Sequence, residues 1–238
     1  EFGRVIHHHR TWEPHIISLI ADNLRRGDVY VDVGANVGVM SFNAAKAVGA
    51  TGKVIAFEPD PTNVNRFLQG VIANAFANVV LFPLALSDKA SVFSLTGSSN
   101  THLIESRDSE RLIQSIPGDY VLESVSRIDF IKLDVEGYEP FALKGLAHTL
   151  KRHKPLVLCE FNPRCLKDHV SVDPAQFAAE LYGITGAIEV IEYNGNRKRV
   201  RNAADLMKLW DVKNREAVKS ELLPDGMLHF DLLFRVNA

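Results

Sequence analysis

The chain has 238 residues, of which 46% are hydrophobic and 24% are charged, a balance typical of one ordinary globular domain. A formal net charge of −2 argues against nucleic acid as a partner, because proteins that bind it usually carry a basic surplus. Two cysteines imply no disulfide framework, and no apolar stretch approaches the length of a membrane span, so we expect a cytoplasmic protein.

Short β-branched runs alternate with longer helical patterns, which predicts a Rossmann-like α/β fold: a mostly parallel sheet with helices on both faces. Apolar spacing predicts an N-terminal helical segment in residues 1–27, with its helix over 14–26, before a single domain over 28–238. The predicted strands cover residues 29–33, 53–57, 78–82, 128–133, 155–161, 187–193 and 229–236. Later helices are predicted over about 37–48, 137–150, 173–183 and 203–220. A further helix is predicted to begin near Pro61.

Several segments depart from the alternation. The last two strands lack long crossover connections, so we expect an antiparallel pair that closes one edge of the sheet. Residues 96–126 carry the weakest pattern and are expected to form a mobile flap. The basic residues at 197–201 are interpreted as a solvated loop, and the three histidines at 7–9 as a terminal segment without a ligand role.

A glycine-bearing turn follows the first strand, in residues 32–38 (DVGANVG). Gly34 and Gly38 allow the backbone to approach a ligand, and the N-terminus of the following helix favours negative charge. The dinucleotide fingerprint G-x-G-x-x-G is incomplete, because Asn36 occupies the place of its middle glycine and would crowd a pyrophosphate. Asp32 adds a carboxylate, which repels phosphate and attracts an ammonium or sulfonium group. The turn therefore predicts S-adenosylmethionine (SAM) as ligand, with a plain strand-to-helix turn of a sugar or nucleotide binder as the alternative.

Polar residues also follow the second and third strands. Glu58, next to Pro59, ends the second strand and is placed to accept hydrogen bonds from both hydroxyls of a ribose. Ser87 and Asp88 follow the third strand, where Asp88 either reads an adenine edge or caps a surface turn.

The fourth strand leads into residues 132–139 (KLDVEGYE), at the edge where an open α/β sheet binds its ligand. Strand alternation puts Lys132 and Asp134 on one side, so Asp134 is expected to face the same crevice as Asp32. Glu136 opens the next helix and is either a site residue or a first-turn acid that complements the helix dipole.

Glu160 and Asn162 end the fifth predicted strand. Together with Asp134 they supply oxygen ligands of the kind that Mg²⁺ and Ca²⁺ prefer. The alternative is a metal-free site in which one carboxylate acts as a general base. We favour the metal-free site, because the ligands are few and nothing in the sequence fixes their geometry.

Four segments together resemble the FkbM-type methyltransferases in order and approximate spacing: residues 32–38 (DVGANVG), 57–59 (FEP), 85–88 (ALSD) and 132–139 (KLDVEGYE). The resemblance runs from about Trp12 to Phe161 and more loosely to the end. It implies a seven-stranded class I methyltransferase sheet and SAM as the methyl donor. It also implies O-methylation, usually of a sugar hydroxyl or a natural-product small molecule.

The resemblance further implies roles for single residues. Those that match the site of the SAM methionine are Asp32, Gly34, Asn36 and Gly38, and the match to the ribose ligand is Glu58. Asp134 and Glu136 match the second acidic motif of the family. Residues 96–126 and 194–227 have no clear match and are expected to face the substrate.

The expected reaction aligns a substrate hydroxyl with the SAM methyl group, and a positioned base typically contributes ~10²–10⁴-fold to such a step. Asp134 is the first candidate for this base, and His102 in the predicted flap is the second. Two rival interpretations are an NAD(P)-dependent oxidoreductase or epimerase, and a SAM-binding module without catalysis. Asn36 and Asp32 argue against a dinucleotide.

Overall fold

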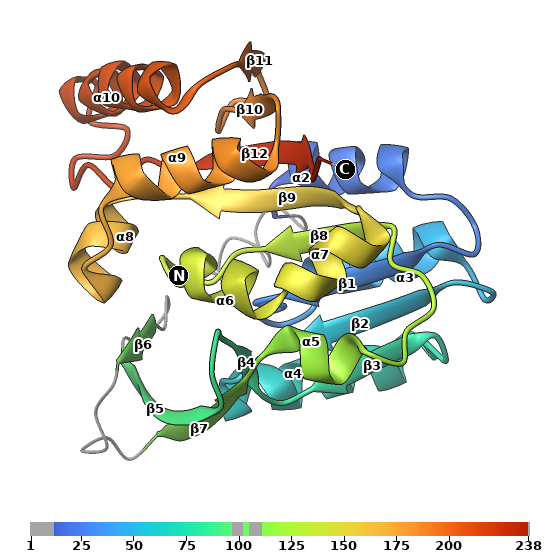
Figure 1. Cartoon of the computed structure of the whole chain (residues 1–238). Coiled ribbons are helices and arrows are strands. Elements are labelled where there is room, and N and C mark those ends of the chain that lie inside the picture. Colours follow the sequence, from blue (N-terminus) through green and yellow to red (C-terminus); the bar gives the residue numbers. More distant parts are fainter. Residues whose placement is uncertain (1–11, 97–101, 105–110, 238) are drawn as a thin grey trace.

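The computed structural model describes residues 12–96, 102–104 and 111–237, which form a layered α/β architecture (Figure 1). The three histidines at 7–9 lie outside these ranges. The central sheet has eight strands in the order β11-β10-β12-β9-β8-β1-β2-β3. They are β1 (Val29–Val33), β2 (Lys53–Phe57), β3 (Val79–Phe82), β8 (Phe130–Leu133), β9 (Leu156–Phe161), β10 (Ile188–Ile191), β11 (Arg197–Val200) and β12 (Phe230–Arg235).

The strands from β3 to β9 run parallel, whereas β12 pairs antiparallel with both β9 and β10. The Rossmann-like α/β class and the antiparallel C-terminal strand are therefore confirmed. The sheet has one strand more than the seven expected, because residues 197–200 pair with β10 as the edge strand β11 instead of forming a solvated loop. Exposed basic side chains are common on edge strands, where they discourage pairing with other chains.

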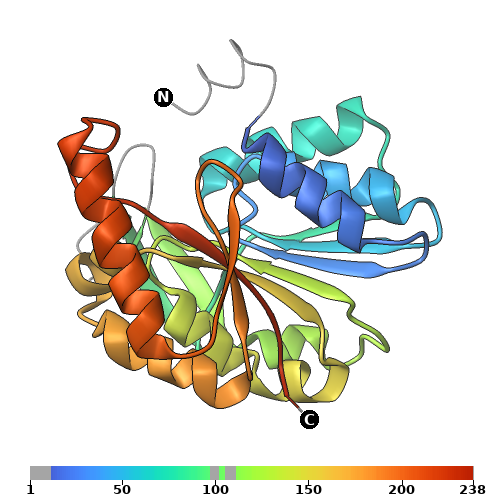
Figure 2. The same cartoon turned by 90° about the horizontal axis from the view of Figure 1, so that it is seen from above.

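Helices cover both faces of the sheet (Figure 2). Because strand side chains alternate, Tyr30 belongs to the core cluster on one face, with Ile16 and Ala44, while Val31 belongs to the cluster on the other face, with Leu143 and Leu181. The first face carries α2 (Pro14–Asn23), α3 (Val39–Val48) and α4 (Pro61–Ala73). The second carries α5 (Gly118–Leu122), α6 (Glu139–Gly145), α7 (Ala147–His153), α8 (Pro163–Val170), α9 (Pro174–Ile184) and α10 (Ala203–Lys219).

The N-terminal helix is shorter than predicted. It ends at Asn23 and not at residue 26, because Leu24 already has an extended backbone. Gly27, with φ of 91°, then turns the chain into β1. Within the described ranges, none of the helices has both the length and the apolar character needed to cross a membrane.

A second, four-stranded sheet begins before the segment expected to be a flap and extends into it. Its strands, in the order β4-β7-β5-β6, are β4 (Ala85–Leu86), β5 (Ser91–Thr96), β6 (His102–Ile104) and β7 (Leu112–Ile116). The part of residues 96–126 that the structure describes therefore contains regular structure (β6, β7 and α5), which the weak sequence pattern did not predict, while the flap stays a prediction. These strands are short. In β7 burial alternates, with Ile113 and Ser115 buried, but the apolar residues of its sequence (LIQSI) do not alternate and so do not predict a strand.

One buried hydrogen bond joins α10 to the chain that enters β12. The indole Nε1 of Trp210 donates to the backbone carbonyl of Leu228 at 2.7 Å, and both residues are buried. This bond fixes the residue just before His229, which reaches the cavity described below.

We expect Trp210→Phe to lower the free energy of unfolding by about 1–3 kcal/mol, because it leaves the buried carbonyl of Leu228 without a donor. Urea unfolding followed by circular dichroism measures this change. Tyr120→Phe is the matched control, since Tyr120 is exposed. An unchanged midpoint for Trp210→Phe would show that the bond contributes nothing.

Candidate functional site

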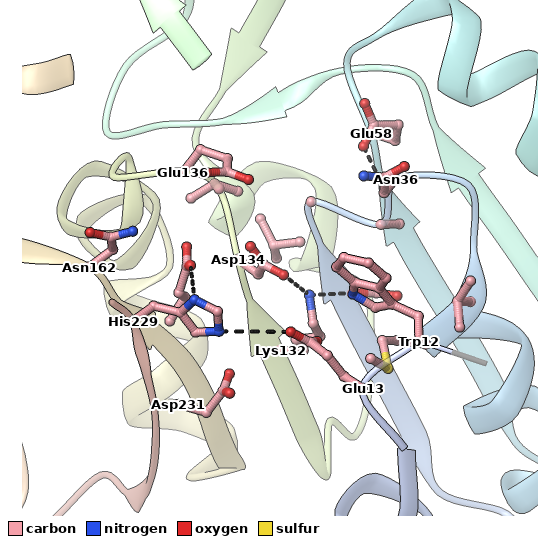
Figure 3. A pocket seen from close by; sticks show the side chains of 18 of the residues that line it. Trp12, Glu13, Asn36, Glu58, Lys132, Asp134, Glu136, Asn162, His229 and Asp231 are labelled. Atoms are coloured by element: carbon pink, nitrogen blue, oxygen red, sulfur yellow. Dashed lines mark hydrogen bonds and ion pairs between the residues drawn. The ribbon is translucent and has the colours of Figure 1, made fainter. Parts of the chain in front are cut away.

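A cavity of about 1110 Å³ opens at the carboxyl ends of β1, β2, β8 and β9, where an open α/β sheet is expected to bind ligands. On the β1–β2 side, its lining includes Asp32, Gly34, Asn36, Glu58 and Pro59. On the β9–β12 side, it includes Glu13, Glu160, Asn162, Tyr193, His229 and Asp231, whereas Trp12 lies on the other side of Lys132 from His229 (Figure 3). Lys132 and Asp134 lie between the two sides (Figure 3).

The turn after β1 is hydrogen-bonded to the end of β2 and packs against the loop after β8. The carbonyl of Phe57 accepts hydrogen bonds from the N–H groups of Gly34 and Ala35, both at 3.0 Å. Gly34 has φ of 82°, and a Cβ atom there would lie 1.9 Å from the carbonyl oxygen of Asp134. Glycine is thus required for close packing against the loop after β8. Gly38 has φ of 94°, precedes α3 and is not among the residues that line the cavity.

Asp32, Lys132 and Asp134 form a charged cluster in the middle of the cavity wall. The ammonium group of Lys132 lies 2.8 Å from Asp134 Oδ2 and 4.0 Å from Asp32 Oδ1. Asp32 is fully buried and accepts a hydrogen bond from the Ser41 hydroxyl, while its Oδ1 has no hydrogen-bond partner. Two carboxylates and one ammonium leave this cluster with a negative charge, although Lys132 weakens the attraction predicted for Asp32 alone.

Burial and pairing shift the pKa values of this cluster in different directions. Burial raises the pKa of Asp32, and Lys132 opposes that shift. Burial also acts to raise the pKa of Asp134, but the ammonium of Lys132 outweighs it and holds this pKa below its ordinary value. Burial lowers the pKa of Lys132, and the two carboxylates more than reverse this, so that Lys132 stays charged. Asp134 is consequently a weak base.

Glu58 is buried at the end of β2 and holds the turn after β1. Its Oε2 accepts a hydrogen bond from the N–H of Asn36 at 2.7 Å, and its Oε1 accepts one from the N–H of Asp60 at 2.9 Å. Asn36 has φ of 51°, a left-handed conformation that asparagine tolerates better than most residues. Burial raises the pKa of Glu58 to about 7, against these hydrogen bonds.

Three predicted site residues have other placements. Ser87 is buried and donates a hydrogen bond to Asp88 at 3.1 Å, whereas Asp88 is exposed. Neither of them is among the cavity-lining residues, although Ala85 and Leu86 just before them are. The backbone of His102 belongs to β6, where it pairs with Thr96, and its side chain lies outside the described part.

A second cluster, on the β9–β12 side, surrounds His229. One ring nitrogen of His229 lies 3.8 Å from Glu160 Oε1, and the other lies 3.7 Å from Glu13 Oε1 (Figure 3). The Glu160 side chain is 9% exposed, and its other oxygen has no hydrogen-bond partner. Burial, reinforced by Asp134, raises the pKa of Glu160 well above its ordinary value.

The pairing of the C-terminal strand adds a further acid to this cluster. Asp231 in β12 lies opposite Glu160 in β9. Burial raises the pKa of Asp231 to about 6, and burial with the nearby Asp231 and Asp134 raises that of Glu13 to about 8. Carboxyl groups with such shifted pKa values, gathered in one cavity, mark a functional site.

The acids after β8 have separate roles. Asp134 and Glu136 both line the cavity, and Glu136 has a left-handed backbone with φ of 55°. Glu139 is fully buried, and its Oε1 accepts hydrogen bonds from the N–H groups of Val135 and Gly137 at 2.9 and 3.3 Å. Glu139 therefore holds the loop that presents the other two acids.

One of the three oxygen groups predicted to bind a metal ion, that of Asn162, is used within the protein. The side-chain oxygen of Asn162 accepts hydrogen bonds from the N–H groups of Arg164 and Cys165, which caps α8. Among the residues that the structure describes, no group of three or more histidine, cysteine, aspartate or glutamate side chains has an arrangement suited to a metal ion.

Sequence reasoning missed Glu13, His229 and Asp231. Glu13 sits at the boundary between a terminal segment and a helix, and His229 is the last residue before an apolar strand. Only Asp231 carries a signal, because it is a charged residue within the apolar run of β12. The register that places it beside Glu160 depends on pairing between distant segments, which the sequence pattern does not specify.

A family model described as the methyltransferase FkbM domain matches residues 32–180. The hexuronic acid methyltransferase AglP of Haloferax volcanii is 28% identical over 188 residues, which cover 76% of this chain and 73% of that protein.

Two solved structures share the fold. Methyltransferase FkbM from Methylobacillus flagellatus KT is 19% identical with a TM-score of 0.53, over 87% of this chain. The match spans only 43% of that protein's length. The fibrillarin/Nop5p complex contains a chain with a TM-score of 0.51 and 11% identity, covering 90% of this chain and 75% of that one.

Proposed function

Because the chain belongs to the FkbM methyltransferase family, we propose that it transfers a methyl group from SAM to a hydroxyl of a sugar or a similar hydroxylated small molecule. The observation that carries the proposal is that Asp32 and Glu58, at the ends of adjacent strands, line one cavity with the turn at Gly34. That the acceptor is a sugar is supported by the relative from Haloferax volcanii, which is named for a hexuronic acid; the charge of that relative's sugar is not part of this proposal.

The residues on the β1–β2 side of the cavity fit SAM. The unpartnered oxygen of Asp32 suits the ammonium of the methionine portion, together with the backbone around Gly34 and Asn36. Glu58 retains acceptor capacity for ribose hydroxyls beside its bonds to backbone N–H groups. The negative charge of the Asp32, Lys132 and Asp134 cluster favours a cationic ligand over a pyrophosphate. When bound, SAM would supply an activated methyl group.

An alcohol acceptor must lose its proton, and we assign this step to His229. Histidine is the most frequent general base in enzymes, and this one lines the cavity between Glu13 and Glu160. Both carboxyl groups are placed to orient the ring, and Glu13, when ionised, would also stabilise the protonated ring. Asp134, the first candidate from sequence, has a lowered pKa beside Lys132 and is proposed to position the acceptor with Glu136.

Calorimetry with SAM, S-adenosylhomocysteine (SAH) and NAD tests the cofactor. We expect SAM and SAH to bind and NAD to show no measurable heat of binding. Transfer of a labelled methyl group to a panel of hydroxylated sugars then tests the reaction. NAD binding with no response to SAM or SAH would exclude the proposed function.

The affinity for SAH is expected to depend on the ionisation of Glu58. Its pKa of about 7 means that Glu58 is largely ionised at pH 8 and largely protonated at pH 6. If the ionised form accepts the ribose hydroxyls, the Kd for SAH should rise about tenfold from pH 8 to pH 6. Calorimetry at both pH values on the wild type and on Glu58→Gln separates this effect from protonation of SAH itself. An equal pH dependence in both proteins would contradict the assignment.

A further inference from the structure

The β9–β12 side of the cavity is rich in carboxyl groups and poor in cationic groups. Among the described lining residues, Lys132 is the single lysine and no arginine is present. Its ammonium contacts Asp134 and Asp32, and His229 lies near two further carboxyls. The carboxyl residues that line this side and its border with Lys132 are Glu13, Asp134, Glu136, Glu160, Asp225 and Asp231. A ligand carboxylate here would meet like charge with no unengaged lysine or arginine to pair with, which is unfavourable.

Hydroxyl groups of a ligand, in contrast, can form hydrogen bonds with the carboxyl groups of this surface. Glu160 is more than nine-tenths buried, lines the cavity and has one oxygen with no hydrogen-bond partner. Whether Glu160 is ionised or carries a proton, a ligand hydroxyl satisfies this oxygen, because a hydroxyl can either donate or accept the hydrogen bond. A hydroxyl both donates and accepts, so it also matches Glu13 and Asp231 whether they are ionised or protonated.

An aromatic side chain, that of Tyr193, also lines this side of the cavity. Tyr193 is 55% exposed, and its ring packs edge-on against His229 with 6.4 Å between centroids. Glu13, on the same wall, has a left-handed backbone with φ of 41°. Strained backbone of this kind is concentrated at binding and active sites. Aromatic faces beside polar groups provide the mixed contacts that a sugar ring needs for its C–H faces and its hydroxyls.

From these observations we infer that the β9–β12 side of the cavity is an acceptor subsite for a neutral sugar ring, and that it discriminates against a ring that carries a carboxylate. This inference rests on the proposed function and specifies its substrate class. Glu13, Glu160 and Asp231 contact the hydroxyls, Tyr193 contacts the ring, and one hydroxyl faces His229.

Binding can be measured without turnover, on the full chain saturated with SAH. Calorimetry at pH 8.5, where Asp231 and most of Glu13 are ionised, compares methyl glucoside, galactoside and mannoside with the corresponding uronates. We expect at least one neutral glycoside to bind about tenfold or more tightly than its uronate, the ratio expected from one like-charge contact. Tighter or equal binding of the uronates, or no binding of any glycoside, would overturn the inference.

The double variant Glu13→Gln/Asp231→Asn tests which groups cause the discrimination. It should strengthen uronate binding, because two negative charges are removed while the hydrogen-bonding shape is kept. The Kd values of the uronate and of the neutral glycoside should then differ by no more than about threefold. The exposed pair Asp22→Asn/Glu123→Gln is the matched control and should leave the ratio unchanged. A ratio that the first pair does not alter would refute the role of these carboxyls. Failure of SAH to bind in the same titrations would instead count against the proposed function.

Discussion

Replacing His229 with glutamine should lower the turnover number for methyl transfer by about 10²–10⁴-fold, because the acceptor hydroxyl loses the base that removes its proton. His229 is 24% exposed and lies within 4 Å of two carboxyl groups, so glutamine can occupy its place without leaving a buried charge unpaired. The Kd for SAH should change little, since His229 lies on the opposite side of the cavity from Glu58 (Figure 3).

The measurement is a single-turnover assay with labelled SAM, paired with calorimetry for SAH. His148→Gln is the matched control, because His148 is an exposed residue of α7 outside the cavity. Asp134→Asn, measured alongside, separates the two candidates for the base. If His229→Gln keeps full turnover and Asp134→Asn loses it, Asp134 and not His229 is the general base.

The second large effect is expected from Lys132→Met, which should lower the free energy of unfolding by about 3–5 kcal/mol. Within the described residues, the ammonium of Lys132 forms an ion pair with Asp32, whose side chain is fully buried and whose Oδ1 lacks a hydrogen-bond partner. Asp134, with 37% of its side chain exposed, can regain hydration, so most of the cost arises at Asp32.

Urea unfolding at pH 7.5 measures this loss. Lys53→Met serves as a control, because Lys53 is an exposed lysine at the start of β2. The double variant Lys132→Met/Asp32→Asn should recover part of the stability, because the carboxylate is removed together with its partner. Wild-type stability in Lys132→Met would show that Asp32 is stable in the fold without a neighbouring cation.

The elements that could be predicted are those whose patterns are local. β1 and β2 have the predicted bounds, because each is a short run of buried residues that ends at a turn. The turn after β1 was also recognisable, although Gly34 is needed for contact with the loop after β8 as much as for any ligand. Sequence periodicity could not foresee that contact, since it joins two segments far apart in the chain.

The candidate site was predictable on one side only. Asp32, Glu58 and Asp134 follow parallel strands whose carboxyl ends necessarily meet at one edge of the sheet, so their convergence could be anticipated. Glu13 and His229 come from a helix start and from the approach to an antiparallel strand. Their places depend on how these segments pack on the sheet, which no local pattern encodes.

The position of β12 between β9 and β10 has a consequence for biosynthesis. Ile191 ends β10 and Phe230 begins β12, and at about 5–20 residues per second a ribosome needs roughly 2–8 s to make the chain between them. During that interval β9 and β10 lack the strand that joins them, and their facing edges are open to pairing with other chains. The nascent protein thus has the β1–β2 wall of its pocket before it has His229, and a chaperone that shields those edges should improve its yield.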